Sequence, residues 1–239
     1  MALELDDLAE IELARMIATI SRDLAHSVPA PRGAPFFGLD SGVRYDLRAF
    51  DALAIRGIFR KYEMVLELGC GLGGRARSLA AAFGCRIVGT DARVGVVAGA
   101  RLLNLRAAMD SQVFFDVGCP ESLPFRERVF THVWILDPRA APGSATLVDM
   151  FRVLRRGGHV AIHTYRSSVP ALADALHTIG FVEAQSHHLA TSELSHTLRV
   201  AEQRLAAVLS SSQLELFRGV LQLPGPEADV VQVSAHRPA

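Results

Sequence analysis

The sequence predicts an α/β fold with a doubly wound, mostly parallel sheet, and three observations lead to this class. Residues 64–91 read as a strand, a tight glycine turn, a helix, a second strand and an acid. From there to residue 186, apolar runs that favour strands alternate with helical stretches rich in Ala and Leu. The chain has 239 residues, half of them hydrophobic, which is enough to bury the core of one such domain.

The glycine turn predicts a ligand site. Gly69, Gly71, Gly73 and Gly74 permit positive φ and let a ligand approach the backbone, while the N–H groups at the start of the next helix point toward it. Asp91 lies about 20 residues beyond the turn, where an acid can accept hydrogen bonds from a ribose diol. This pattern is shared by several nucleoside-binding α/β folds, so it predicts a nucleoside ligand without naming it.

The segment from Glu67 to Gly73, ELGCGLG, narrows the choice. It resembles the first motif of class I S-adenosylmethionine-dependent methyltransferases, a hydrophobic residue followed by (D/E)-x-G-x-G-x-G. The alternative, NAD binding, usually has the first glycine directly after the strand. The resemblance implies a seven-stranded sheet and S-adenosylmethionine as cofactor, with Glu67 facing the methionine amino group and Asp91 holding the ribose hydroxyls. The cofactor-binding residues that it implies are Glu67, Gly69, Gly71, Asp91, Ala92, Cys119 and Leu136.

Two later stretches extend the resemblance. Residues 118–137, GCPESLPFRERVFTHVWILD, are similar to a segment of the ubiquinone-biosynthesis-like methyltransferases, and residues 155–158 match the glycine turn that precedes their fifth strand. Residues 129–136, 159–164 and 181–185 are expected to be strands. The last strand, 230–235, is expected to be the antiparallel one of this fold. The resemblance covers roughly residues 62–186 and this last strand.

The sequence departs from the family pattern at two places. The acid that contacts the adenine amino group in the family falls at Cys119, a weak acceptor, unless Glu121 or a backbone group replaces it. A histidine pair that many small-molecule members carry appears as Ala140-Ala141. Two interpretations follow: a divergent methyltransferase, or a scaffold redirected to ring closure or elimination with a vestigial or structural cofactor.

Asp137 and His163 are the candidate catalytic residues, because both lie at the carboxyl ends of predicted strands, where ligands of open α/β sheets bind. Asp137 is a candidate proton acceptor. His163 has an ordinary pKa near 6.5, which suits a general base, although a histidine satisfied within the core is an equal alternative. Arg139 and Arg166 are candidate binding groups for a substrate anion, with solvated surface arginines as the competing interpretation.

The remaining segments are expected to cover the domain. Residues 1–61 are expected to form an N-terminal helical cap, with an amphipathic helix over 3–25, an irregular connection over 27–42 and a helix over 46–61. Residues 62–239 would form the methyltransferase-like domain, with a helical insertion at 191–222. The insertion is a candidate roof for the active site or a surface for a second copy or a partner protein.

Composition limits the partners. Formal net charge is zero and no block of like charge occurs, so nucleic acid is not expected. No apolar run reaches the ~20 residues that span a bilayer, and the acidic amphipathic start is unlike a signal peptide, so a cytoplasmic protein is expected. The three cysteines are expected to be reduced, and His187-His188 lack metal-ligand spacing, so no metal is expected.

These observations favour methyl transfer to an O, N or C nucleophile of a small metabolite, in bacterial specialised biosynthesis. The bacterial source rests on the bias toward arginine and alanine. The alternatives are the redirected reaction and a non-catalytic subunit that binds a partner chain.

Overall fold

A computed structural model describes residues 5–26, 30, 34–41, 63–137, 141–188 and 230–239. The helix expected over 46–61 and the insertion expected over 191–222 lie outside these ranges, as do Arg139 and Ala140. The division into a cap and a methyltransferase-like domain therefore stays a prediction.

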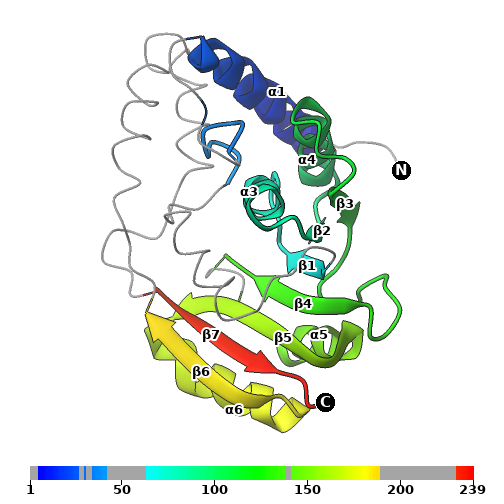
Figure 1. Cartoon of the computed structure of the whole chain (residues 1–239), viewed down its shortest axis with the longest axis vertical. Helices are drawn as coiled ribbons and strands as arrows, with labels where there is room; N and C mark the ends of the chain where they lie inside the picture. Colours follow the sequence, from blue (N-terminus) through cyan, green and yellow to red (C-terminus); the bar gives the residue numbers. More distant parts are fainter. Residues whose placement is uncertain (1–4, 27–29, 31–33, 42–62, 138–140, 189–229) are drawn as a thin grey trace.

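The described strands form one seven-stranded sheet in the order β3-β2-β1-β4-β5-β7-β6 (Figure 1). Strands β1 to β5 pair in parallel, and β7 runs antiparallel to both β5 and β6, as the sequence predicts. The strands are β1 (Met64–Leu68), β2 (Arg86–Asp91), β3 (Val113–Val117), β4 (Phe130–Ile135), β5 (Leu154–Tyr165), β6 (Val182–His188) and β7 (Val230–His236).

Helices cover both faces of the sheet, because side chains that alternate along its central strands are buried on both sides. Val65 of β1 belongs to one buried cluster, with α3 and α4 residues, whereas Leu66 belongs to another, with α5 and α6 residues. This arrangement confirms the doubly wound class. The helices are α1 (Leu5–Ala25), α3 (Gly74–Phe83), α4 (Val94–Arg106), α5 (Ser144–Val153), α6 (Val169–Ile179) and the short 3₁₀ helix η1 (Arg166–Ser168).

Two strand boundaries differ from the predicted ones by three residues or more. β5 begins at Leu154 instead of residue 159, because Leu154 already pairs with Phe130 before a register shift. β6 continues to His188, where we expected it to end at residue 185, because His187 and His188 pair with β7. These two histidines therefore belong to a strand rather than following it.

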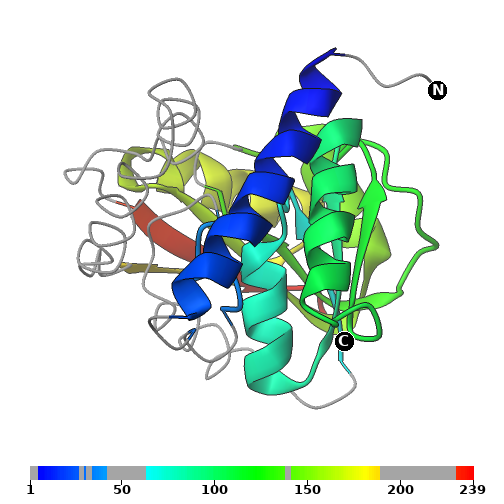
Figure 2. The same cartoon turned by 90° about the horizontal axis from the view of Figure 1, so that it is seen from above.

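Helix α1 packs along α4 (Figure 2) and confirms the predicted N-terminal amphipathic helix. Two glycines of α4 make the close approach possible. A Cβ at Gly95 would lie 2.3 Å from the Asp7 Cα atom, and one at Gly99 would lie 3.1 Å from the Ala14 Cβ atom. The Asp7 carboxylate also accepts a hydrogen bond of 2.6 Å from the Gly95 N–H, near the start of α4. No helix in the described ranges is long and apolar enough to cross a membrane.

The turn over residues 34–41 is fixed to α3 by a buried ion pair. Arg77, fully buried, donates to the Asp40 carboxylate at 2.8 and 3.2 Å, and its guanidinium lies over the Phe36 and Phe115 rings. Phe36 and Phe37 pack with α1 residues in a buried cluster, so these two rings anchor the turn to the core. The turn thereby holds Ser41 at the edge of the site described next.

Candidate functional site

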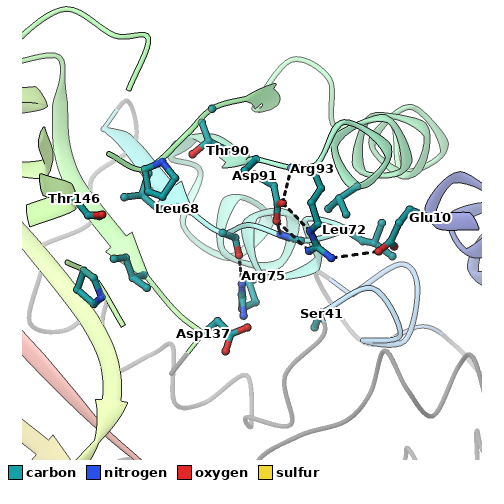
Figure 3. Close-up of a pocket in the computed structure, with 18 of the residues that line it drawn as sticks. Glu10, Ser41, Leu68, Leu72, Arg75, Thr90, Asp91, Arg93, Asp137 and Thr146 are labelled. Carbon is teal, nitrogen blue, oxygen red and sulfur yellow. Dashed lines mark hydrogen bonds and ion pairs between the residues drawn. The ribbon is translucent and has the colours of Figure 1, made fainter. Parts of the chain in front are cut away.

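A pocket of about 620 Å³ opens at the carboxyl ends of β1, β2 and β4 (Figure 3). This is where ligands of open α/β sheets bind. Glu10 of α1, Ser41 of the 34–41 turn and Thr146 of α5 add walls from outside the sheet. The pocket joins the following residues at the strand ends: Leu68, Gly69, Gly71, Thr90, Asp91, Ala92, Ile135 and Asp137.

The glycine turn has the predicted geometry. Gly69, Gly71 and Gly73 have φ of 65°, 55° and 81°, and no atom lies within 4 Å of a Cβ built on Gly69 or Gly71. At Gly73 a Cβ would overlap the Phe115 ring at 2.1 Å. Gly74 is required for another reason, since its Cβ would lie 2.6 Å from the Ser41 Oγ atom. The turn thus leaves an open backbone surface facing the pocket.

Asp91 lies in the pocket wall, as predicted, with 8% of its surface exposed. The Gly71 N–H donates to its Oδ2 at 3.3 Å, and the Arg93 N–H donates to Oδ1 at 3.1 Å. The Arg93 side chain adds hydrogen bonds of 3.1 and 3.4 Å and reaches Glu10 at 3.3 Å. Burial raises the pKa of Glu10, and Arg93 opposes that rise. A chain of three charged groups therefore links α1 to the end of β2.

Glu67 is not among the residues that line the pocket, so its expected contact with the amino group of a ligand stays a prediction. It is fully buried, and its Oε1 accepts a hydrogen bond of 2.7 Å from Nε of Arg75, which is the second residue of α3. Arg75 lines the pocket in its place. Burial raises the pKa of Glu67, and Arg75 opposes the rise.

Sequence reasoning missed Arg75. The signal that could have found it is an arginine in the first turn of a helix, where the helix dipole disfavours a cation unless an acid pairs with it.

The adenine side of the site differs from the expectation at Cys119. The thiol is exposed and donates to the Glu121 carboxylate at 2.7 Å, which lowers the pKa of Glu121. Glu121 lines the pocket, and Cys119 does not. Ala92 lines the pocket, as predicted. Leu136 is fully buried and does not line the pocket, and its carbonyl accepts a hydrogen bond of 3.5 Å from Arg75 Nη1.

Of the two catalytic candidates, the structure brings only Asp137 to the pocket. His163 is fully buried within β5, opposite Gln232 of β7, and is absent from the pocket lining. Burial, and next the nearby Arg75 cation, lower the pKa of His163 to about 4. The expected pKa near 6.5 is therefore wrong, and His163 is neutral at neutral pH and out of reach of a substrate.

Arg166, a candidate for binding a substrate anion, lies away from the pocket, 3.5 Å from the His188 ring on the surface. All three cysteines are free. Within the described ranges, no group of three or more His, Cys, Asp or Glu side chains could hold a metal ion.

The region that forms the pocket is similar to a known protein family. Residues 65–158 match the family model described as a methyltransferase domain. This part of the chain is thus similar to a methyltransferase domain. The domain contains β1 to β4, the start of β5 and every strand end that contributes to the pocket.

Methyltransferases with different named substrates are similar to this chain. The sterol 24-C-methyltransferase of Kluyveromyces lactis is 26% identical over 115 residues, which are 47% of this chain and 31% of that protein. The chain thus matches about a third of the length of this curated relative. The structure of phosphoethanolamine N-methyltransferase 2 from Haemonchus contortus, in complex with S-adenosyl-L-methionine, has a TM-score of 0.63 at 19% identity, over 80% of this chain and 52% of that one.

A third similar structure covers more of the chain. The structure of the cyclase SpnF has a TM-score of 0.63 at 17% identity and covers 95% of both chains. At this identity the likeness shows the fold alone.

Proposed function

We propose that the protein transfers the methyl group of S-adenosylmethionine to an O, N or C nucleophile of a small molecule. The observation that carries this proposal is that one pocket joins the open glycine turn, the Asp91 carboxylate and the Asp137 carboxylate. The pocket volume of about 620 Å³ lies within the range of small-molecule sites. The alternation of strands and helices leaves these groups at one edge of the sheet.

The residues present fit the adenosyl part of the cofactor. A Cβ at Gly69 or Gly71 would fill the open surface of the turn, and Asp91 offers carboxylate oxygens to a ribose diol if Arg93, whose side chain is 62% exposed, moves aside. Ala92 and Pro120 provide small apolar walls for the base, with Glu121 beside them. When bound, S-adenosylmethionine supplies a methyl group on a positively charged sulfur.

Asp137 is the residue that we place beside the substrate nucleophile. It lies just beyond the end of β4, lines the pocket and is half-buried. A carboxylate there can hold a substrate hydroxyl or amine by hydrogen bond and accept its proton. The nearby walls, Ile135, Pro142 and Thr146, exclude water and limit the poses of the substrate. Alignment of this kind is a large source of rate in displacement reactions.

Titration calorimetry with S-adenosylhomocysteine tests the cofactor site. We expect micromolar binding to the wild-type protein, weakened about 10- to 100-fold or lost in Asp91→Ala, because a carboxylate acceptor of charge-assisted hydrogen bonds is removed. Asp116→Ala is the matched control, since Asp116 is an exposed aspartate of β3 outside the pocket lining. Equal binding by wild type and Asp91→Ala would contradict the proposed site.

A redirected reaction is the second candidate function. One observation favours it: the Cys119 thiol lies at the place where the family resemblance implies an acid, and it donates a hydrogen bond to Glu121. In such a reaction the same pocket would align a substrate that carries its own leaving group. A substrate converted to a product of unchanged carbon count, with no S-adenosylhomocysteine released, would support it, whereas cofactor-dependent methylated product would rule it out.

The bacterial source, the cytoplasmic location, the role in specialised biosynthesis and the pairing with a second chain stay predictions.

A further inference from the structure

Arg75 is the feature that distinguishes the inner end of the pocket. The side chain is 4% exposed, yet it lines the cavity. Its Nε, Nη1 and Nη2 atoms donate to Glu67 Oε1, the Leu136 carbonyl and the Gly69 carbonyl at 2.7, 3.5 and 3.1 Å. A guanidinium carries five N–H groups in a planar fork, so one N–H on each terminal nitrogen is left over. Two parallel donors on one cation form a receptor for a carboxylate.

Glu67, in contrast, is fully buried and does not line the pocket. Its Oε1 is taken by Arg75, and its Oε2 has no hydrogen-bond partner among the described residues but is buried from the pocket surface. To take over Oε1, a ligand ammonium would have to displace the 2.7 Å ion pair, in which both side chains are at least 96% buried, and Oε2 is itself buried. Displacing one partner of a buried pair leaves an uncompensated charge, which costs several kcal/mol.

We propose that Arg75 recognises the α-carboxylate of the amino-acid end of the ligand, and that Glu67 positions Arg75 instead of binding the ligand's ammonium group. This proposal rests on the proposed function, because it concerns the same cofactor pocket. Asp91 lies at the other end of the Gly69–Gly71 turn and would hold the ribose in either case. The pocket therefore selects for ligands that carry a carboxylate and is tolerant of ligands that lack the amino group.

Three ligands separate these contributions in titration calorimetry: S-adenosylhomocysteine, its decarboxylated analogue and its deaminated analogue. For the wild-type protein we expect the decarboxylated analogue to bind about 10- to 100-fold more weakly than the parent, the range of a lost charge-assisted hydrogen bond. The deaminated analogue is expected to bind within about threefold of the parent, less than the effect of one ordinary hydrogen bond.

Two variants assign the effect to Arg75. In Arg75→Gln the preference for the parent over the decarboxylated analogue should fall to near one. The double variant Glu67→Gln with Arg75→Gln avoids an unpaired buried carboxylate and should behave in the same way if the single variant does not fold. Arg93→Gln is the matched control: it also removes a pocket arginine paired with an acid, and it should shift the affinities of both ligands together, with their ratio unchanged.

The outcomes are distinct. A deaminated analogue that binds much more weakly than the decarboxylated one would show that Glu67 takes the ammonium and would overturn the inference, while the proposed function stands. An unchanged carboxylate preference in folded Arg75→Gln would overturn it as well. No binding of S-adenosylhomocysteine to the wild-type protein would overturn both the inference and the proposed function.

Discussion

At the scale of single residues, burial decides which charged groups can act. His163 and Asp137 both stand at the ends of adjacent parallel strands, yet one is fully buried and the other lines the pocket. Burial stabilises the neutral imidazole because an imidazolium there would lose its hydration. Histidine is the residue type whose usual pKa suits a general base, but the fold buries His163 away from the pocket.

His163 should make stability depend on pH. The pKa is about 4 in the folded protein and near 6.5 in the unfolded chain, so the unfolded state takes up a proton first as pH falls. The stabilising contribution of neutral His163 is fully present above pH ~6.5 and is lost between pH ~6.5 and ~4, by about 3 kcal/mol in total.

Urea unfolding of wild type and His163→Gln at pH 7 and pH 4.5 measures this contribution. The wild-type free energy of unfolding should fall by more than that of the variant, and His177→Gln, at an exposed position of α6, should follow the wild type. The same pH dependence in wild type and His163→Gln would contradict the assignment.

Sequence reasoning placed residues correctly at this scale where the backbone alone sets their position. Gly69, Gly71 and Asp91 follow from a turn and a strand end, which are local features. Glu67 and Arg75 could not be assigned in this way, because which partner an acid chooses depends on side chains that converge in three dimensions. The thiol of Cys119, directed to Glu121 on the surface, is a similar case.

At the scale of elements, helix α1 is a fixed wall of the pocket. It contributes Glu10 to the lining, and the close contact with α4 depends on Gly95 and Gly99. The Asp7 carboxylate on the Gly95 N–H favours the start of α4, because a negative charge complements that end of a helix. Docking of α1 and the shape of the cofactor pocket are therefore coupled.

Gly95→Ala tests this coupling. The added Cβ would meet backbone atoms of Asp7 at 2.3 Å and 2.6 Å, and backbone cannot move aside as a flexible side chain can. We expect a loss of about 1–3 kcal/mol in the free energy of unfolding, together with weaker binding of S-adenosylhomocysteine. Gly143→Ala is the control, because nothing lies within 4 Å of a Cβ there and its φ is −77°. Wild-type stability and binding in Gly95→Ala would show that α1 is not held in this way.

Element order was predictable because hydrophobic periodicity and turn residues are local signals. The exact ends of β5 and β6 were not, since Leu154 and His188 join the sheet only through partners from β4 and β7. The backbone hydrogen bonds that extend these two strands come from neighbouring strands, and local sequence patterns do not predict them.

At the scale of the whole molecule, the site is a product of topology. Asp91 and Asp137 meet at one edge because parallel strands end together there, and Glu10 reaches the same pocket from α1. The predicted roof over residues 191–222 lies outside the described residues, so the substrate wall on that side stays a prediction. The described residues form a small-molecule pocket that is lined at one end by the buried Arg75 cation.

A crystal structure of the protein with S-adenosylhomocysteine tests the central claim most directly. The account predicts the ribose on Asp91, the adenosyl group against the Gly69–Gly71 turn, the ligand carboxylate on Arg75, and the Glu67–Arg75 ion pair intact. Ligand density elsewhere on the molecule would contradict the proposed function. Ligand in the pocket with its ammonium on Glu67 and Arg75 turned away would keep the function and contradict the role given to Arg75.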